Sequence, residues 1–389
     1  MDSPQEYEPA QRALVAARLA AELSFLRDQW PRCRELANHA LGIVNAQPAL
    51  RLRVLHLRDY VLRHPDAISE RLAVGAEVSA IASQLADYVA LFFGALAKAV
   101  SHFEMGDIGR AEAEFEVAEH AGAMAGRPLC RAIAAGFKTM LAAFDGRLAE
   151  AEDLYLRCRN EAAACGMPEL GDQCWPVMIV PLGECERLGE LESAAKLTFR
   201  RHPKSPVYRA MYCWLAFRQD NPLEARFHLE RLAADNFAGL KHSGGGLAAA
   251  ALLAEVCAGL GNVAHHTAAV YELLLPYKDR NIILAHAAAL GSASRYLGIV
   301  AAALARGEDA VRHFQDALNL NTRLGARTWA AYSRFELAGA LCNRAGAGDR
   351  EHAAELLGNA RAEALTLGMR TLAAACQRQC WVTPPALLM

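Results

Sequence analysis

The sequence predicts an all-α protein, built as a right-handed superhelix of stacked helix-turn-helix repeats. Apolar residues recur at helical spacing along the 389 residues, and small turn residues interrupt them about every 15–20 residues. The turn glycines Gly106, Gly146 and Gly189 lie 40 and 43 residues apart, which is the period of a helical repeat. Strand signals are almost absent, since no Asn-Gly or Asp-Gly pair is flanked by alternating β-branched residues.

The expected array holds about nine antiparallel helix pairs. The first helices of the pairs are expected at 9–27, 50–63, 88–105, 128–144, 172–188, 206–219, 245–260, 283–305 and 328–344. Their partners are expected at 31–46, 67–86, 108–124, 148–165, 190–201, 222–234, 263–276, 308–324 and 350–367. All of 1–389 forms one array, with N-terminal repeats in 1–87, central repeats in 88–240, C-terminal repeats in 241–369, and a capping helix and tail in 370–389.

The second helices of several pairs share a small–large–small pattern. Its residues stand at positions i, i+4 and i+7, which lie on one face of a helix. The pattern occurs at Ala111/Phe115/Ala118, Ala151/Tyr155/Cys158, Ala310/Phe314/Ala317 and Ala353/Leu357/Ala360. Leu297, Gly298 and Ala301 precede Ala310 at tetratricopeptide spacing. We therefore expect a tetratricopeptide-like α-solenoid, in which the first helices line a concave groove.

The composition limits which partners the protein is expected to bind and in which compartment it is expected to occur. Lys and Arg number 41 against 43 Asp and Glu, so the net charge of −2 gives no general attraction to nucleic acid or an anionic membrane. The acidic start lacks a secretory signal, and no apolar stretch of about 18 residues predicts a membrane helix. The 11 cysteines form no C-x-x-C pair, which favours reduced thiols in a cytoplasmic protein and no metal site. No cofactor is expected.

Nine short segments share residues with one group of known proteins. They are Leu232–Ala238, Leu252–Cys257, Tyr271–Tyr277, Arg280–Asn281, Tyr296–Gly298, His313–Phe314, Leu324–Arg327, Gly348–Glu351 and Leu367–Met369. Through them the chain, over about 100–375, resembles the tetratricopeptide-like C-terminal region of large bacterial ATPase regulators. Those regulators join a P-loop ATPase to adenylate/guanylate cyclase or helix-turn-helix DNA-binding modules.

The resemblance implies a helical scaffold that senses a ligand or a partner, and it implies no activity. The chain has no G-x-x-x-x-G-K-[ST] sequence, so the nucleotide-binding loop of those regulators is missing. The linker Lys241–Gly246 also departs from the bulkier polar and aromatic stretch of the group. Two interpretations stay open: a stand-alone relative, which we favour, or an excised sensor region.

Arg295 is the most notable candidate ligand-binding residue. It is a cation in an otherwise apolar helix, so it requires an anionic or carbonyl partner. That partner is either a ligand in the groove or a carboxylate of a neighbouring helix. Arg334, near Trp329 and Tyr332, is expected to face the same groove, or else to pack between repeats.

Basic and aromatic residues on other first helices extend the candidate site. Lys98 and Lys138 each stand eight residues before a turn glycine, and Arg131 shares the face of Lys138. They form either a positive ladder along the groove or a solvated face.

The aromatic candidates are Tyr88, Phe92 and Trp175, for which core packing is the alternative. Pro181 is expected to kink helix 172–188 and open space beside Trp175.

Three residues are weak catalytic candidates. His286 lies in an apolar helix, where it is either a core histidine or a general base. His242 and Ser243 precede three glycines, which form either a flexible connection or a nest beside a Ser243 nucleophile. No G-x-S-x-G sequence supports the second interpretation.

Three hypotheses of function follow. The leading one is a non-catalytic regulatory scaffold that binds a small molecule or peptide in its concave groove. The alternative is an enzyme of specialised metabolism that uses the interior as an acid/base pocket for cyclisation, elimination or isomerisation. The third is an adaptor that binds a protein partner, or a second copy of itself through the apolar tail Ala386–Met389.

Overall fold

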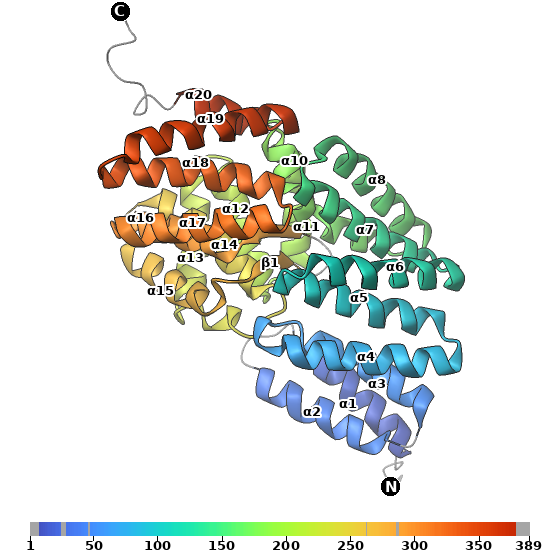
Figure 1. Cartoon of the computed structure of the whole chain (residues 1–389). Coiled ribbons are helices and arrows are strands. Elements are labelled where there is room, and N and C mark those ends of the chain that lie inside the picture. The colour runs from blue at the N-terminus through green and yellow to red at the C-terminus, as the bar shows by residue number, and fades with distance from the viewer. Residues whose placement is uncertain (1–7, 25–28, 46, 262, 285–287, 379–389) are drawn as a thin grey trace, which may run out of the picture.

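The computed structural model confirms that the chain is all-α, with one short hairpin of strands (Figure 1). It describes residues 8–24, 29–45, 47–261, 263–284 and 288–378. In these ranges most helices pack side by side with the next helix in the chain. None of the described helices is long and apolar enough to cross a membrane. His286 and the tail Ala386–Met389 lie outside the described residues.

The N-terminal helices agree with the predicted ranges to within a few residues. They are α1 (Pro9–Leu23), α2 (Trp30–Ile43), α3 (Pro48–Val61), the 3-10 turn η1 (Pro65–Ala67) and α4 (Ile68–Leu85). Proline opens α1, α3 and η1, where its fixed φ suits the first turn and its missing N–H leaves no hydrogen bond unmade.

The central helices also follow the prediction. They are α5 (Tyr88–Met105), α6 (Ile108–Ala125), α7 (Pro128–Asp145), α8 (Leu148–Ala164), α9 (Pro168–Gln173), η2 (Trp175–Met178), α10 (Ile179–Gly183), η3 (Leu188–Leu191), α11 (Glu192–Arg201), α12 (Pro206–Arg218) and α13 (Pro222–Ala233). The turn from α5 to α6 is built by Gly106, with φ of 79°, and by Asp107, whose side chain accepts a hydrogen bond from the Arg110 N–H. In place of the predicted helix 172–188 the structure has the end of α9, η2, which contains Pro176, and α10, which contains Pro181.

The C-terminal part contains the hairpin. Its elements are η4 (Ala238–Leu240), α14 (Gly246–Leu260), α15 (Ala264–Leu274), η5 (Leu275–Tyr277), β1 (Asn281–Leu284), β2 (Ala288–Ser292), α16 (Ala293–Ala303), α17 (Gly307–Arg323), α18 (Arg327–Arg344), α19 (Asp349–Leu367) and α20 (Arg370–Arg378). The predicted helix 283–305 is therefore wrong in its first part, because 281–284 and 288–292 pair as antiparallel strands.

Hydrogen bonds from distant helices explain the hairpin. Asn281 donates to the Phe103 carbonyl at 3.2 Å, and the Trp329 indole donates to the Ala289 carbonyl at 3.0 Å. The Ser292 N–H donates to the Asn321 side chain at 2.9 Å. The bonds from Trp329 and Asn321 pair backbone groups of β2, and the Asn281 side chain pairs a carbonyl of α5. All three partners come from segments that local sequence cannot reveal.

The hairpin lies among helices that are far apart in sequence. β1 contacts α5 and α14, and β2 contacts α7, α17 and α18. The Thr328 hydroxyl of α18 also donates to the Ala143 carbonyl of α7 at 2.8 Å. We expected the first helices of the pairs to line a groove. Of these, α5, α7, α14 and α18 pack against the hairpin.

One continuous apolar core runs from Phe92 to Cys376, while the helices before α5 hold three smaller clusters. The small–large–small residues of the second helices are all buried, as predicted. Burial of Ala111, Phe115 and Ala118 in α6, for example, lets the backbones of paired helices approach closely around one bulky side chain.

Candidate functional site

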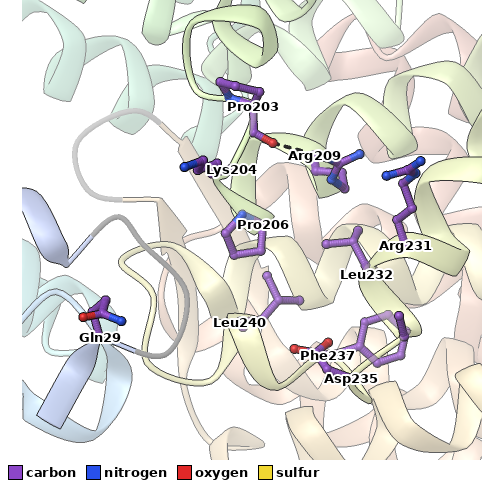
Figure 2. A pocket seen from close by; sticks show the side chains of 12 residues that line it. Gln29, Pro203, Lys204, Pro206, Arg209, Arg231, Leu232, Asp235, Phe237 and Leu240 are labelled. Carbon is purple, nitrogen blue, oxygen red and sulfur yellow. Dashed lines mark hydrogen bonds between the residues drawn. The ribbon is translucent and has the colours of Figure 1, made fainter.

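A cleft of about 640 Å³ lies where the N-terminal helices face α12 and α13 (Figure 2). Gln29, which precedes α2, lines it from the N-terminal side. Leu240 and Phe237 contribute apolar surface from the segment that leads to α14. Arg209 of α12 and Arg231 of α13 lie together at one side of the cleft in this view.

Three cations line the cleft: Lys204, Arg209 and Arg231. Among the described lining residues, Asp235 is the one carboxylate. Burial lowers the pKa of Arg209, and so does the nearby positive charge of Arg231, which repels it. An anion placed between them relieves this repulsion.

Arg209 is held in a fixed orientation. One guanidinium nitrogen donates to the Pro203 carbonyl at 3.1 Å, and another lies 3.2 Å from Nδ1 of His228. The guanidinium also lies over the Phe199 ring, 5.0 Å from its centre. A preorganised cation of this kind loses little side-chain entropy when an anion binds.

The local sequence explains how the chain bends around the cleft. Ser205 caps α12 by accepting a hydrogen bond from the Tyr208 N–H, and Pro206 opens the helix. After α13, Asn236 and Phe237 both adopt positive φ, 57° and 59°. This conformation costs roughly 1 kcal/mol or more for each non-glycine residue, and such strain is typical of ligand sites. Together these two turns bring Lys204 and Phe237 to the same cleft.

Arg295 does not face this cleft. It is 4% exposed, and its Nε and Nη2 donate to Glu336 at 2.9 and 2.5 Å. Its Nη1 donates to Glu255 at 3.1 Å. The structure thus shows the carboxylate partner that was the alternative to a ligand for this residue.

The carboxylates beside Arg295 carry opposite pKa shifts. Burial raises the pKa of Glu336 to about 7, although Arg295 opposes this. The charges of Arg295 and Arg218 outweigh burial at Glu255 and lower the pKa of its carboxyl. Glu255 is close to both Arg295 and Arg218, whereas Arg295 is the one cation paired with Glu336 among the described residues, so the Glu336 carboxyl retains its proton more readily.

The aromatic candidates near Arg295 are also engaged within the protein. The Arg295 guanidinium lies 5.3 Å from the Trp329 ring and 5.0 Å from the Tyr332 ring. The Tyr332 hydroxyl donates to Glu184. Trp175 is buried in η2, and Arg334 is partly buried on α18. Neither residue lines the 640 Å³ cleft.

The predicted positive ladder is neutralised by glutamates of adjacent helices. Lys98 pairs with Glu114 at 2.7 Å, and Lys138 pairs with Glu119 at 2.5 Å. Arg131 donates to Glu161 at 3.0 Å. Lys138 and Arg131 are 44% and 49% exposed, in line with the solvated-face alternative, whereas Lys98 is only 17% exposed.

The last two aromatic candidates, both on α5, differ in exposure. Phe92 is fully buried in the core, and Tyr88 is 37% exposed. Neither lines the 640 Å³ cleft.

His242 and Ser243 do not form a nucleophile pair. The Ser243 hydroxyl donates to the Gly239 carbonyl at 2.6 Å. The glycines that follow are closely packed, because a Cβ on Gly246 would stand 1.9 Å from the Leu240 carbonyl oxygen. This close packing, and not flexibility, accounts for glycine at Gly246. His242 instead lies beside His64.

Sequence reasoning missed the residues that the fold brings together. Arg209 and Arg231 come from different helices, and nothing in their local sequence sets them apart from other arginines. His64 and Asp66 form a His-Pro-Asp triplet directly after a helix, a local pattern that we did not weigh. Its proximity to His242 depends on the fold alone.

Comparison with known proteins gives no family for this chain. No family model matches the sequence, and no curated protein matches it at a significant level.

Proposed function

We propose that this protein is a non-catalytic, regulatory binding scaffold whose ligand is an anionic small molecule or the anionic group of a peptide. Its binding site is the cleft lined by Lys204, Arg209 and Arg231. In this proposal the helices form a right-handed, tetratricopeptide-like superhelix of about nine repeats.

The observation that carries the proposal is the charge imbalance in the cleft. Two guanidinium groups and one ammonium group surround an apolar floor that includes Phe237 and Leu240. Guanidinium groups match carboxylate, phosphate and sulfonate oxygens with paired hydrogen bonds. The volume of about 640 Å³ falls in the range of small-molecule pockets.

The position of the cleft supports a sensing role. Its described walls come from Gln29, which precedes α2, and from α12, α13 and the segments before α12 and before α14. A ligand that contacts Gln29 and Arg209 together bridges these two parts of the chain, so binding favours one arrangement of them. Arg295, the main predicted groove residue, is paired with Glu255 and Glu336, and for this reason we place the ligand in the cleft.

The proposal can be tested with 8-anilinonaphthalene-1-sulfonate, which combines one anionic group with an aromatic body. We expect saturable binding at one site of the full-length protein, measured by fluorescence titration, with displacement by inorganic pyrophosphate. The variant Arg209→Gln/Arg231→Gln should lose roughly tenfold or more in affinity for each arginine, because a hydrogen bond to a charged group contributes about 1.5–3 kcal/mol.

The matched control is Arg200→Gln/Arg323→Gln, which removes two exposed arginines that do not line the cleft. This control should bind the probe as the parent does. Equal weakening in both double variants would attribute binding to net charge and would overturn the proposed site. Chemical change of a bound compound recovered from the protein would favour the enzyme alternative.

A further inference from the structure

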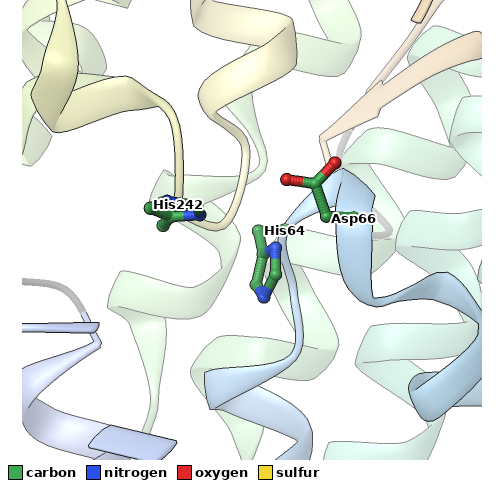
Figure 3. Close-up of side chains that lie close together, drawn as sticks. All are labelled: His64, Asp66 and His242. Atoms are coloured by element: carbon green, nitrogen blue, oxygen red, sulfur yellow. The ribbon is translucent and has the colours of Figure 1, made fainter. Parts of the chain in front are cut away.

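Two histidines and an aspartate meet beside the cleft, at the junction of the N-terminal helices with the segment before α14 (Figure 3). His64 and Asp66 flank Pro65, the first residue of η1, and His242 comes from the turn between η4 and α14. One nitrogen of each imidazole and one oxygen of the Asp66 carboxylate all lie within 4.8 Å of one another.

His64 has no internal partner to explain its burial. Its side chain is buried, at 3% exposure, and neither ring nitrogen has a hydrogen-bond partner among the described residues. Buried polar groups in folded proteins nearly always have such a partner. An imidazole in this position therefore points to a ligand that the protein side chains do not supply.

Neighbouring rings and hydroxyls fix the three side chains. The Trp30 ring stacks on His242, with centres 4.5 Å apart, and meets the His64 ring edge-on at 5.2 Å. The Tyr277 hydroxyl donates to Oδ1 of Asp66 at 2.7 Å. This hydrogen bond orients the carboxylate in the way that outer partners orient metal ligands.

We propose that His64, His242 and Asp66 bind a divalent transition-metal ion of the zinc class. Two imidazoles and one carboxylate are a recurring ligand set for such ions, and they are poorly suited to Mg²⁺ or Ca²⁺. Bonds of about 2.0–2.1 Å place tetrahedral ligand atoms about 3.4 Å apart, so small side-chain rotations close the observed set. Asp66 is exposed, which leaves a coordination position open to water.

The electrostatics of the cluster favour this cation. Burial, followed by the charge of His242, lowers the pKa of His64 to about 4, and burial also lowers that of His242. A metal ion binds the neutral form of an imidazole. Arg71, which also lowers the pKa of His64, is paired with Glu104.

The site can be tested with Zn²⁺ on the full-length protein after chelator treatment. We expect one Zn²⁺ per chain by isothermal titration calorimetry, no binding of Mg²⁺ under the same conditions, and a higher melting temperature with Zn²⁺. His242→Gln and Asp66→Asn should each weaken Zn²⁺ binding by at least about tenfold, and His64→Gln should abolish it. The exposed His120→Gln is the matched control and should bind as the parent does.

Co²⁺ distinguishes this site from the cysteines. A His–His–Asp site gives cobalt d–d bands without the charge-transfer band that a thiolate ligand produces.

Circular dichroism of His242→Gln, whose altered side chain is only partly buried, checks that lost binding is not lost folding. A thiolate band, or Zn²⁺ affinity unchanged in folded His242→Gln and Asp66→Asn, would overturn the proposal. This inference is independent of anion binding in the cleft.

Discussion

The N-terminal block, α1–α4, and the remainder of the array, α5–α20, both consist mainly of paired helices, but their apolar cores differ. Beyond α5 one apolar cluster is continuous and includes large aromatic side chains such as Trp214 and Phe137. In α1 and α2 the buried residues are almost all alanines, and the clusters are separate. Because alanine buries little apolar area, α1 and α2 gain less free energy from their packing than helices that bury large side chains.

The difference shows that cohesion in this array depends on contacts between distant segments. The larger region is tied across its interior by the hairpin and by the hydrogen bond from Thr328 to Ala143. The block is joined to it at a seam, where Arg71 of α4 donates to Glu104 and Ser101 of α5. The cleft and the His64–Asp66–His242 cluster lie along the same seam.

Removal of Arg295 should have the largest effect on the larger region. Arg295→Met leaves Glu336 buried without its cation, leaves Glu255 with Arg218 at 3.6 Å, and removes the guanidinium group from beside three aromatic rings. Breaking a buried ion pair by removing one partner costs about 3–5 kcal/mol. We expect a loss of this size in chemical denaturation. Arg312→Met, at an exposed pair on α17, should change stability by less than about 0.5 kcal/mol.

Removal of Arg71 should instead weaken the seam. Arg71→Met leaves Glu104 buried and unpaired at the junction of α4 with α5, at a cost of about 3 kcal/mol. Amide hydrogen exchange should rise in α1–α4 while α7 and α18 keep their protection. A uniform rise across both regions would contradict the comparison, because it would show that the block and the larger core unfold as one unit.

The pH dependence of the Glu336 carboxyl gives the smallest and sharpest test. Its pKa is raised in the folded state to about 7, so the folded protein holds a proton that the unfolded chain releases above about pH 4.5. The stabilising contribution of the proton on Glu336 is fully present below about pH 4.5. It is lost as the pH rises from there through 7. The loss is at most about 1.4 kcal/mol per pH unit.

Glu336→Gln should remove this slope, as shown by denaturation curves at pH 5, 6, 7 and 8. The control Glu308→Gln, at a side chain that is 78% exposed, should retain it. Parallel curves for the parent and Glu336→Gln would mean that Arg295 keeps Glu336 ionised throughout this range.

The candidate site was much harder to predict than the fold. The expected ranges match most helices because capping residues, prolines and apolar spacing act within a few residues of one another. Arg295 was correctly singled out as a cation that needs a partner, but its partners, Glu255 and Glu336, lie about 40 residues away on either side. Local sequence cannot choose between those carboxylates and a ligand.

The sequence by itself determined the all-α class, most helix boundaries, the turn glycines and the small residues between paired helices. These features depend on backbone conformation and on periodicity along one helix. Only the tertiary structure decided that 281–284 pairs with 288–292 as strands, that Arg209 and Arg231 share a cleft, and that His64 meets His242. Each of these outcomes depends on satisfying buried polar or charged groups with partners from remote segments, and such partners are specified only when the whole chain has packed.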